Sequence, residues 1–469
     1  MYDVVIVGGG FAGVTAAREC ALRGRTTLLL EGRERLGGRT WSTDWAGTRI
    51  ELGGAWVHWH QPHTFSELTR AGLAVELGRD ADHAGWYVGQ ERRSGTIAQR
   101  DEIARRGWDS FVDGVTEALP LPHAPLHALP ELARFDRLTI AQRIDQLELD
   151  DEERAVLSAE LESLAHAPLT EAGAVSVLRW HALSGNSLAL TQETGGRATI
   201  VGGTGALLDA IAGVAPFDVR LGSPVAGIAE PNGHVEVSTR DGGAYAARAA
   251  IVAVPLNALG AIEFTPELAE DKRRAIALGQ ASRGIKVMIH ARGDASMQNA
   301  IRPGHPFGYL DTEELFDDGT QLLVGFGPDA ENCDGYVPDA GLGNGSVPGV
   351  GGKPLDDSGA AQSDEAGCRV GSKPEGGGLP ALQTSLDEIL PGYEALEATA
   401  HDWLADEFSR GTWAIHRPGW YEHHHAAMRR VDGRVLLAGS DLADGWAGFI
   451  DGAIESGLRA GRLAAELSS

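Results

Sequence analysis

Apolar and polar positions at the start of the chain follow the order strand, turn, helix and strand. Apolar runs at residues 3–7 and 26–30 predict two buried strands, and residues 12–22 between them predict a helix. The turn after the first strand contains Gly8, Gly10 and Gly13. A glycine turn that leads from a strand into a helix lets backbone N–H groups and the helix N-terminus approach a pyrophosphate. The pattern therefore predicts a dinucleotide site in an α/β domain.

Further along, the pattern divides the chain into a helical part and parts rich in strands. Residues from about 64 to 190 have mainly the period of amphipathic helices, one of which is expected at residues 108–119. Alternation returns between residues 218 and 254 and predicts several strands, and the apolar segment 284–290 predicts another. Near the C-terminus, an apolar run at residues 435–438 predicts a strand, and a glycine-rich turn then opens a helix that is expected to end near residue 467.

Two features after the second strand narrow the choice of dinucleotide. Glu31 follows this strand at the distance from Gly8 at which an acidic side chain can bind ribose hydroxyls. A second glycine pair, Gly37 and Gly38, precedes Arg39 and adds another place where the backbone and a cation can approach a phosphate. Nicotinamide sites rarely need this second approach, so the run favours FAD.

The run from Glu31 to Thr40 and the segment from Glu51 to Val57 resemble the flavin amine oxidase family, in which the same stretches hold FAD. The resemblance implies an α/β fold with a Rossmann-like (GR2-type) FAD-binding domain and a second, α+β substrate-binding domain, both discontinuous in sequence. The implied FAD-binding domain comprises residues 1–78, 198–280 and 406–469. The implied substrate-binding domain comprises residues 79–197 and 281–405.

The resemblance also implies which residues bind the cofactor. The C-terminal strand and turn match the family's final FAD segment, so Gly439 and Asp441 are expected at the pyrophosphate and ribityl chain. Val225 matches a position whose backbone holds the adenine, although an ordinary sheet residue is an equally good interpretation. The full expected set is Gly8, Gly10, Phe11, Ala12, Gly13, Glu31, Gly32, Arg33, Gly37, Gly38, Arg39, Gly53, Gly54, Ala55, Trp56, Val225, Gly439, Ser440, Asp441, Gly448 and Phe449.

Lysine is rare in this chain, which makes Lys286 a candidate catalytic residue. The four lysines of the sequence are Lys272, Lys286, Lys353 and Lys373. Alternation in the strand predicted at residues 284–290 places Lys286 on the face opposite Ile285 and Val287. A buried ammonium group needs water or a partner. In the resembling family a lysine in this strand reaches the flavin N5 through a water molecule; the alternative is a solvated lysine on an edge strand.

Two aromatic residues match the aromatic cage that the family places in front of the flavin. We expect Trp413 and Phe449 to contact the substrate and to act in catalysis, with packing in an ordinary core as the alternative. Trp180 and His58 are further expected substrate contacts. Thr412 occupies the position at which the covalently flavinylated members carry cysteine, so FAD is expected to be bound noncovalently.

The charge and composition exclude several classes of partner. The chain has 66 acidic and 40 basic residues and a formal net charge of −26, which argues against nucleic acid and anionic membranes. It has no apolar stretch long enough to span a membrane and no pattern of a secretory signal, so a cytoplasmic protein is expected. The three cysteines and the histidine groups lack metal-site spacing, so no metal is expected. Whether the chain forms a homodimer is left open.

Residues 331–378 differ from the rest of the chain in composition. They are dense in Gly, Pro, Ser and Asp and show no apolar period, which predicts a disordered or loosely packed insert. A natural surface loop and a locally shifted reading frame would both produce such a composition. A helix is expected to follow at residues 381–390.

Together, these features predict an FAD-dependent amine oxidase. The expected substrate is a primary or secondary amine of the aryl-alkyl or alkaloid type, oxidised to an imine that water hydrolyses to an aldehyde and an amine. O2, reduced to H2O2, or another acceptor would take the electrons. The alternatives are an L-amino-acid oxidase, for which Arg179 is a candidate carboxylate partner, a flavin desaturase of the carotenoid or porphyrinogen type, and a noncatalytic FAD-binding protein.

Overall fold

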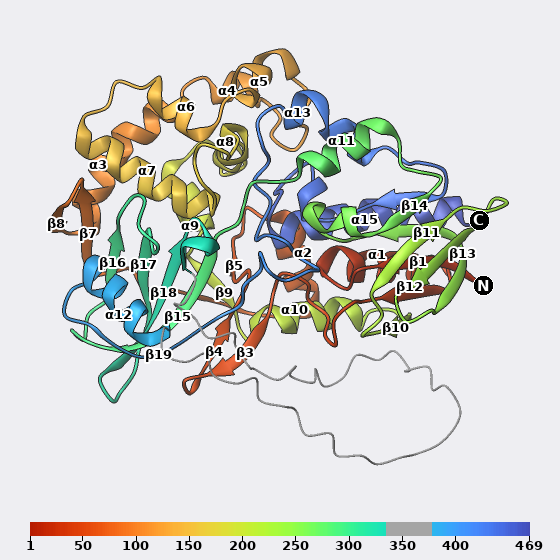
Figure 1. Cartoon of the computed structure of the whole chain (residues 1–469), viewed down its shortest axis with the longest axis horizontal. Coiled ribbons are helices and arrows are strands. Elements are labelled where there is room, and N and C mark those ends of the chain that lie inside the picture. Colours follow the sequence, from red (N-terminus) through yellow and green to blue (C-terminus); the bar gives the residue numbers. More distant parts are fainter. Residues whose placement is uncertain (334–377) are drawn as a thin grey trace.

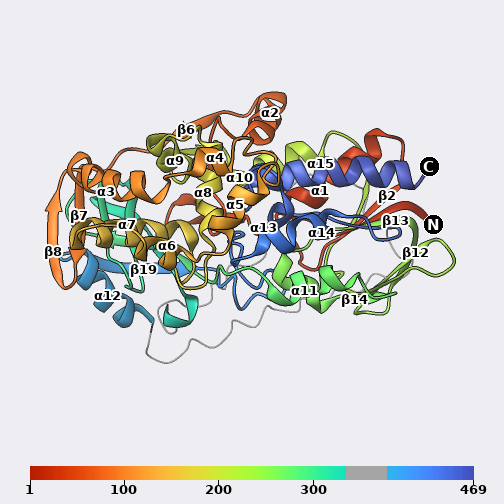
Figure 2. The same ribbon diagram turned by 90° about the horizontal axis from the view of Figure 1, so that it is seen from above.

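The protein consists of two parts, each built on a large β-sheet, that lie side by side (Figure 1). The computed structural model describes residues 1–333 and 378–469, so the insert predicted at residues 331–378 lies almost entirely outside the described residues. The N- and C-termini lie next to each other at the outer end of one part, as Figure 1 and Figure 2 both show. The α/β fold class expected from the sequence is confirmed.

The first part is built on a mixed sheet of eight strands. Its strands run in the order β10 (Asp218–Arg220), β2 (Thr27–Leu30), β1 (Tyr2–Val7), β13 (Ala244–Val252), β12 (Val235–Thr239), β11 (Val225–Ala229) and β14 (Glu263–Thr265), and β20 (Val435–Leu437) pairs with β13. Strand β1 is parallel to both of its neighbours and its apolar centre is fully buried. All eight strands fall in the ranges expected for the cofactor domain; the domain boundaries themselves stay a prediction.

Helix α1 (Phe11–Leu22) packs at short range against α15 (Ile450–Leu467), and this contact joins the two ends of the chain. A Cβ atom added to Gly457 would overlap the carbonyl oxygen of Ala12, and one added to Gly461 would lie 2.7 Å from Cβ of Glu19. Both positions therefore need glycine, because close-packed helices leave no room for an extra carbon. The contact fixes the C-terminal helix against the helix that follows the glycine turn.

The second part is built on a seven-stranded, mostly antiparallel sheet. Its strands run in the order β19 (Glu394–Ala400), β15 (Ile285–Arg292), β18 (Thr320–Gly327), β17 (Tyr309–Leu315), β16 (Gln298–Ile301), β7 (His83–Val88) and β8 (Glu91–Gly95). Helices α7 (Asp151–Ala165) and α12 (Gly378–Ile389) pack against this sheet. The other helices on this side are α3 (Ile97–Phe111), α4 (Val115–Ala118), α5 (Leu129–Asp136), α6 (Ile140–Asp145), α8 (Ala174–Leu183) and α9 (Leu188–Thr194).

Smaller elements complete the described part of the chain. Two short sheets contain β3 (Ser42–Trp45) with β4 (Thr48–Glu51), and β5 (Trp56–Val57) with β9 (Ala198–Ile200) and β6 (Val75–Leu77). The further α-helices are α2 (Pro62–Ala71), α10 (Gly203–Ala212), α11 (Glu270–Leu278), α13 (Trp420–His423) and α14 (His425–Arg429). Among the described residues, we find no helix that combines the length and apolar character of a membrane span.

Two expectations from the sequence are wrong in the second part. Residues 83–95 lie in the region expected to be helical, but they form β7 and β8 because β7 pairs with both β8 and β16. The single helix expected at residues 108–119 is divided between the end of α3 and the short helix α4. The division falls at Gly114, whose φ of +82° is left-handed and interrupts the helical path.

The substitution Gly457→Ala tests the contact between α1 and α15. We expect it to lower the free energy of unfolding by about 1–3 kcal/mol, because the added methyl group must push the helices apart. The control is Gly205→Ala in α10, where the new Cβ would make ordinary contacts with the Ser42 side chain, at 3.6 Å from Oγ and 4.0 Å from Cβ. That variant should be as stable as the wild type or up to about 1 kcal/mol more stable. Equal urea midpoints for both variants would contradict the close-contact explanation.

Candidate active site

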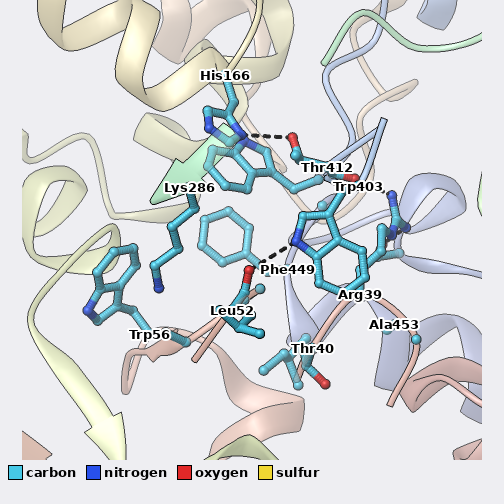
Figure 3. A pocket seen from close by; sticks show the side chains of 18 of the residues that line it. Arg39, Thr40, Leu52, Trp56, His166, Lys286, Trp403, Thr412, Phe449 and Ala453 are labelled. Atoms are coloured by element: carbon cyan, nitrogen blue, oxygen red, sulfur yellow. Dashed lines mark hydrogen bonds between the residues drawn. The ribbon is translucent and has the colours of Figure 1, made fainter. Parts of the chain in front are cut away.

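A cavity of about 760 Å³ lies between the two parts and is lined by residues from both. Its lining includes the glycine turn between β1 and α1, the turn before α15, and residues of β15, β17 and β18. Figure 3 shows that Arg39, Lys286, His166 and Phe449 converge on this space from segments far apart in the sequence. The cavity is therefore the candidate active site.

The two glycine turns expected to hold the cofactor lie against each other in the cavity wall. The N–H group of Gly37 donates to the carbonyl oxygen of Gly9 at 2.9 Å, and Gly10 forms a β-bridge with Gly37. Gly38 has a φ of +59°, and a Cβ atom there would lie 3.2 Å from the Cα atom of Gly10. Glu31 accepts a hydrogen bond from Gly9 N at 2.6 Å. The two turns thus form one continuous backbone surface.

Most of the expected cofactor residues line the cavity. They are Gly8, Gly10, Phe11, Ala12, Glu31, Gly32, Arg33, Gly37, Gly38, Arg39, Gly53, Gly54, Ala55, Trp56, Val225, Gly439, Ser440, Gly448 and Phe449. Gly13 does not line the cavity: a Cβ atom there would overlap the carbonyl oxygen of Gly8, so its role is to let the turn close. Backbone N–H groups, an arginine and an apolar remainder fit the flavin dinucleotide that the resemblance implies.

The Asp441 side chain lies behind the residues that line the cavity, and its expected contact with the cofactor stays a prediction. Its carboxylate is 1% exposed, forms an ion pair with Arg39 and accepts from Leu256 N at 2.9 Å. Arg39 also donates to the carbonyl oxygen of Thr412 at 2.6 Å and to Ser440 Oγ at 2.9 Å. Burial acts to raise the pKa of Asp441, but the guanidinium and the hydrogen bonds hold it below its usual value. Asp441 therefore positions Arg39, which does line the cavity.

His58 also lies outside the lining, and the expected substrate contact stays a prediction. Its imidazole is fully buried and its ring centre lies 3.8 Å from that of Trp59. Its backbone N–H donates to Gln61 Oε1 at 3.3 Å, where the chain turns into α2. His58 Nε2 lies 3.5 Å from Oε2 of Glu193, which is a lining residue. The His58 side chain therefore lies in the interior, behind the residues that line the cavity.

Lys286 lies in β15 and faces the cavity, on the strand face opposite the packed core. Ile285 and Val287 belong to the apolar core on the other face, as alternation predicts. The Lys286 side chain is buried and lies beside Trp56 (Figure 3). Its Nζ is 4.8 Å from the ring centre of Trp56 and 5.9 Å from that of Phe326. The ammonium group therefore sits between aromatic faces at the edge of the cavity.

The electrostatic environment makes Lys286 easier to deprotonate than a solvated lysine. Burial lowers its pKa, and the nearby carboxyl groups of Glu313 and Glu51 act in the opposite direction. Glu51 is tied to Thr204 by a hydrogen bond from the Thr204 N–H at 2.7 Å. Burial also raises the pKa of Glu313, and Lys286 acts to lower it.

Aromatic side chains from three segments form the walls of the cavity. Trp413 lies parallel to His166, with ring centres 4.3 Å apart and an interplanar angle of 5°, and its indole N–H donates to Leu164 O at 3.0 Å. Phe449 meets Trp180 edge to face at 5.1 Å. Trp413, Phe449 and Trp180 all line the cavity, as expected of substrate contacts, and their roles in catalysis stay a prediction.

His166 is a lining residue that the sequence did not indicate. Its Nε2 lies 2.9 Å from the carbonyl oxygen of Ile285, which can only accept, so Nε2 carries the proton. Its Nδ1 lies 2.9 Å from Thr412 Oγ1 and accepts from that hydroxyl group (Figure 3). Burial lowers the pKa of His166 to about 4, so the ring is neutral. It thereby links the strand of Lys286 to the Trp413 segment.

The contact network of His166 explains why the sequence carried no signal for it. It joins residues 166, 285 and 412, and only the folded chain brings these together. One local sign exists: Gly284 leaves room for the imidazole, since a Cβ atom there would overlap the His166 ring.

Comparison with known proteins gives consistent results. Residues 11–336 and 379–464 match the family described as flavin containing amine oxidoreductase. A pseudooxynicotine dehydrogenase from a Pseudomonas species is 32% identical over 98% of this chain and 85% of its own length. A nicotine dehydrogenase from Pseudomonas putida is 33% identical over 100% of this chain and 89% of its own. A solved structure of a putrescine oxidase variant superposes with a TM-score of 0.77 at 20% identity, covering 99% of this chain and 98% of that one, so it has the same fold.

The neutral state of His166 predicts a pH dependence of stability. Its pKa lies near 4 in the folded protein, against 6.5 when solvated, so the unfolded chain binds more protons between these values. The free energy of unfolding should therefore fall, by up to about 3 kcal/mol from this group, as pH decreases from 6.5 to 4. His166→Gln keeps one donor and one acceptor and should show a shallower decrease in urea unfolding.

The exposed His423 provides the matched control. His423→Gln should reproduce the wild-type pH profile, because it removes an imidazole at the surface and leaves the buried His166 unchanged. If His166→Gln and the wild type give parallel profiles over this pH range, the buried neutral imidazole is not the cause.

Proposed function

Because this chain belongs to the family of flavin-containing amine oxidoreductases, we propose that it is an FAD-dependent enzyme that oxidises an aryl-alkyl or alkaloid-type amine. Two electrons and two protons leave a primary or secondary amine R–CH2–NH–R′ to give the imine R–CH=N–R′. Water then hydrolyses the imine to an aldehyde and an amine. O2 takes up the two electrons and two protons and becomes H2O2.

One observation carries this proposal: a buried lysine and two aromatic side chains line the same cavity as the glycine turns. Lys286 lies in the sheet of the second part, and Trp413 lies in the segment between β19 and α13. Phe449 directly precedes α15. No cluster of nucleophile and base is needed, because the chemistry is electron transfer from the carbon next to the amine nitrogen. The protein has to bind, orient and keep the amine neutral.

We assign the cofactor to the side of the cavity that is formed by the first part of the protein. FAD supplies an isoalloxazine ring that accepts the two electrons. The glycine turns and Arg39 would hold the pyrophosphate, and Glu31 would bind the ribose. The N-terminus of α15 would face one end of the isoalloxazine ring, where the helix dipole favours negative charge. Binding would be noncovalent: Thr412 stands where the covalent members carry cysteine, and its hydroxyl group is engaged by His166 at 2.9 Å.

The lining residues of the second part would act on the substrate. The amine reacts as the neutral base, and apolar aromatic walls favour that form by penalising the ammonium ion. Lys286 would hold a water molecule beside the reacting atoms, for use in imine hydrolysis and in electron transfer to O2. Its lowered pKa suits this role, since a less strongly protonated amine can accept as well as donate hydrogen bonds.

The substrate class is supported by the relatives and by the lining. Two similar proteins are named for nicotine and pseudooxynicotine, and aromatic residues contribute much of this cavity. The amino-acid alternative loses its main support, because Arg179 is 1% exposed, lies outside the lining, and donates to Tyr421 Oη and to the carbonyl oxygen of Gly445. The buried cation of Lys286 beside paired aromatics also argues against a C–C desaturase.

Substitution of Lys286 tests its proposed role in amine oxidation. Under anaerobic conditions an aryl-alkyl secondary amine should bleach the visible flavin absorbance of the wild-type protein. Lys286→Met should retain flavin but lower kcat on the order of 100-fold, because the group that holds the water is lost. Stopped-flow measurements of flavin reduction by the amine and of flavin reoxidation by O2 will show which of these two steps is slowed.

Arg292→Met is the control, since Arg292 ends the same strand with a side chain that is 61% exposed. This variant should keep both the flavin content and the wild-type rates. If Lys286→Met keeps the wild-type rates, the proposed role of Lys286 in catalysis is wrong. A yellow protein that no amine in a broad panel bleaches would reject the proposed function.

A further inference from the structure

A buried arginine lies behind the cavity wall, and the proposed function gives it no role. Arg179 in α8 donates to the phenol oxygen of Tyr421 and to the carbonyl oxygens of Asp444 and Gly445, the last at 2.7 Å. Each of these acceptors is an uncharged oxygen atom. A buried cation is costly unless it is well bonded, and the bonds of Arg179 reach two separate segments of the chain.

The bond from Arg179 to Tyr421 continues through His416 to a further point of the backbone before α15. Tyr421 Oη lies 3.3 Å from His416 Nδ1, and His416 Nε2 lies 2.8 Å from the carbonyl oxygen of Asp441. A carbonyl oxygen can only accept, so Nε2 carries the proton and Nδ1 accepts from the phenol. Burial lowers the pKa of His416 to about 3, which keeps the ring neutral. The three side chains therefore form one directed chain of hydrogen bonds.

Helix α8 holds the segment that precedes α15, residues 441–449, which we call the pre-α15 segment. Arg179 binds the middle of this segment through the two carbonyl oxygens, and His416 binds its first residue. Trp180, the next residue of α8, donates from its indole N–H group to the carbonyl oxygen of Ala447 at 3.0 Å. Each of these bonds resists displacement, because breaking it leaves a buried polar group unsatisfied.

The pre-α15 segment ends at Phe449, which lines the cavity (Figure 3). Its ring meets Trp180 edge to face at 5.1 Å and Trp446 at 5.2 Å. Trp446 belongs to the same segment, is fully buried and donates to the carbonyl oxygen of His60 at 2.9 Å. The place of the Phe449 ring therefore follows the path of the pre-α15 segment and its contact with α8.

We propose that Arg179, Tyr421 and His416 are positioning residues for the amine oxidation, because they hold the pre-α15 segment in the path that sets the Phe449 ring against the substrate. This inference rests on the proposed function, in which that ring contacts the substrate. The three side chains lie outside the cavity lining, so they act through the segment that they hold. A small displacement of the wall misorients the reacting carbon, which lowers the rate more than it weakens binding.

Fluorine NMR of the Phe449 ring tests this positioning without reference to the reaction. The probe is 4-fluorophenylalanine, incorporated at position 449 of the protein with its own cofactor. Tyr421→Phe removes the hydroxyl group that joins Arg179 to His416, and we expect the fluorine signal to shift or split. A signal identical to that of the wild type would overturn the proposal.

Tyr393→Phe is the matched control for the loss of a buried phenol hydroxyl group. Tyr393 is buried in the second part, outside the cavity lining, and its hydroxyl group donates to the carbonyl oxygen of Asp294 at 3.0 Å. This variant should keep the wild-type fluorine signal and the wild-type rate of flavin reduction. If it changes the signal as much as Tyr421→Phe does, the effect is not specific and the proposal is wrong.

A double-mutant cycle tests whether the three residues act through Phe449. With an aryl-alkyl amine under anaerobic conditions, Tyr421→Phe should lower the limiting rate of flavin reduction about tenfold and change the apparent Kd of the amine little. In the Phe449→Ala background the same substitution should change that rate by less than about twofold, because the ring through which it acts is absent. Equal effects in both backgrounds would overturn the proposal.

Arg179→Lys provides a second variant if Tyr421→Phe does not fold. Lysine keeps the buried positive charge but lacks the planar fork of donors, so the fluorine signal should again shift and the rate should again fall only when Phe449 is present. A wild-type signal and rate would overturn the proposal, as would failure of both variants to fold, which would make the residues necessary for folding instead. If no amine reduces the flavin, the proposed function is rejected, while the fluorine signals still show whether these residues position the ring.

Discussion

The guanidinium group of Arg39 holds together three segments that are far apart in the sequence. It binds the backbone of Thr412, the hydroxyl group of Ser440 and the buried carboxylate of Asp441. Moving these segments apart would break the ion pair and leave a buried charge without its partner, which is costly. The contact therefore fixes the segments together. The glycine turns, the Trp413 segment and the turn before α15 keep their positions around the cavity because of this contact.

A second set of contacts connects that frame to the sheet of the other part. His166 binds the backbone beside Lys286 on one side and the hydroxyl group of Thr412 on the other, and it stacks on Trp413. Thr412 therefore belongs to both sets, through its carbonyl oxygen and its hydroxyl group. In the proposed function, the first part would hold the cofactor while the second presents lysine, aromatic and carboxyl groups to the same cavity.

The sequence predicted what depends on short-range order. The glycine turns and the strand face on which Lys286 lies both follow from local patterns, and the structure contains both. The position of Asp441 and His58 in their motifs did not show that their side chains lie outside the cavity lining. His166 was missed because its partners, Ile285 and Thr412, come together with it only in the folded chain.

The most direct test of this account is a crystal structure of the purified protein with its own cofactor and a bound amine. The account predicts FAD in the cavity, with its pyrophosphate at the glycine turns, no bond to Thr412, and its isoalloxazine ring beside Lys286 with the amine between Trp413 and Phe449. A different cofactor, or a ring that lies away from Lys286 and these two aromatic residues, would contradict it.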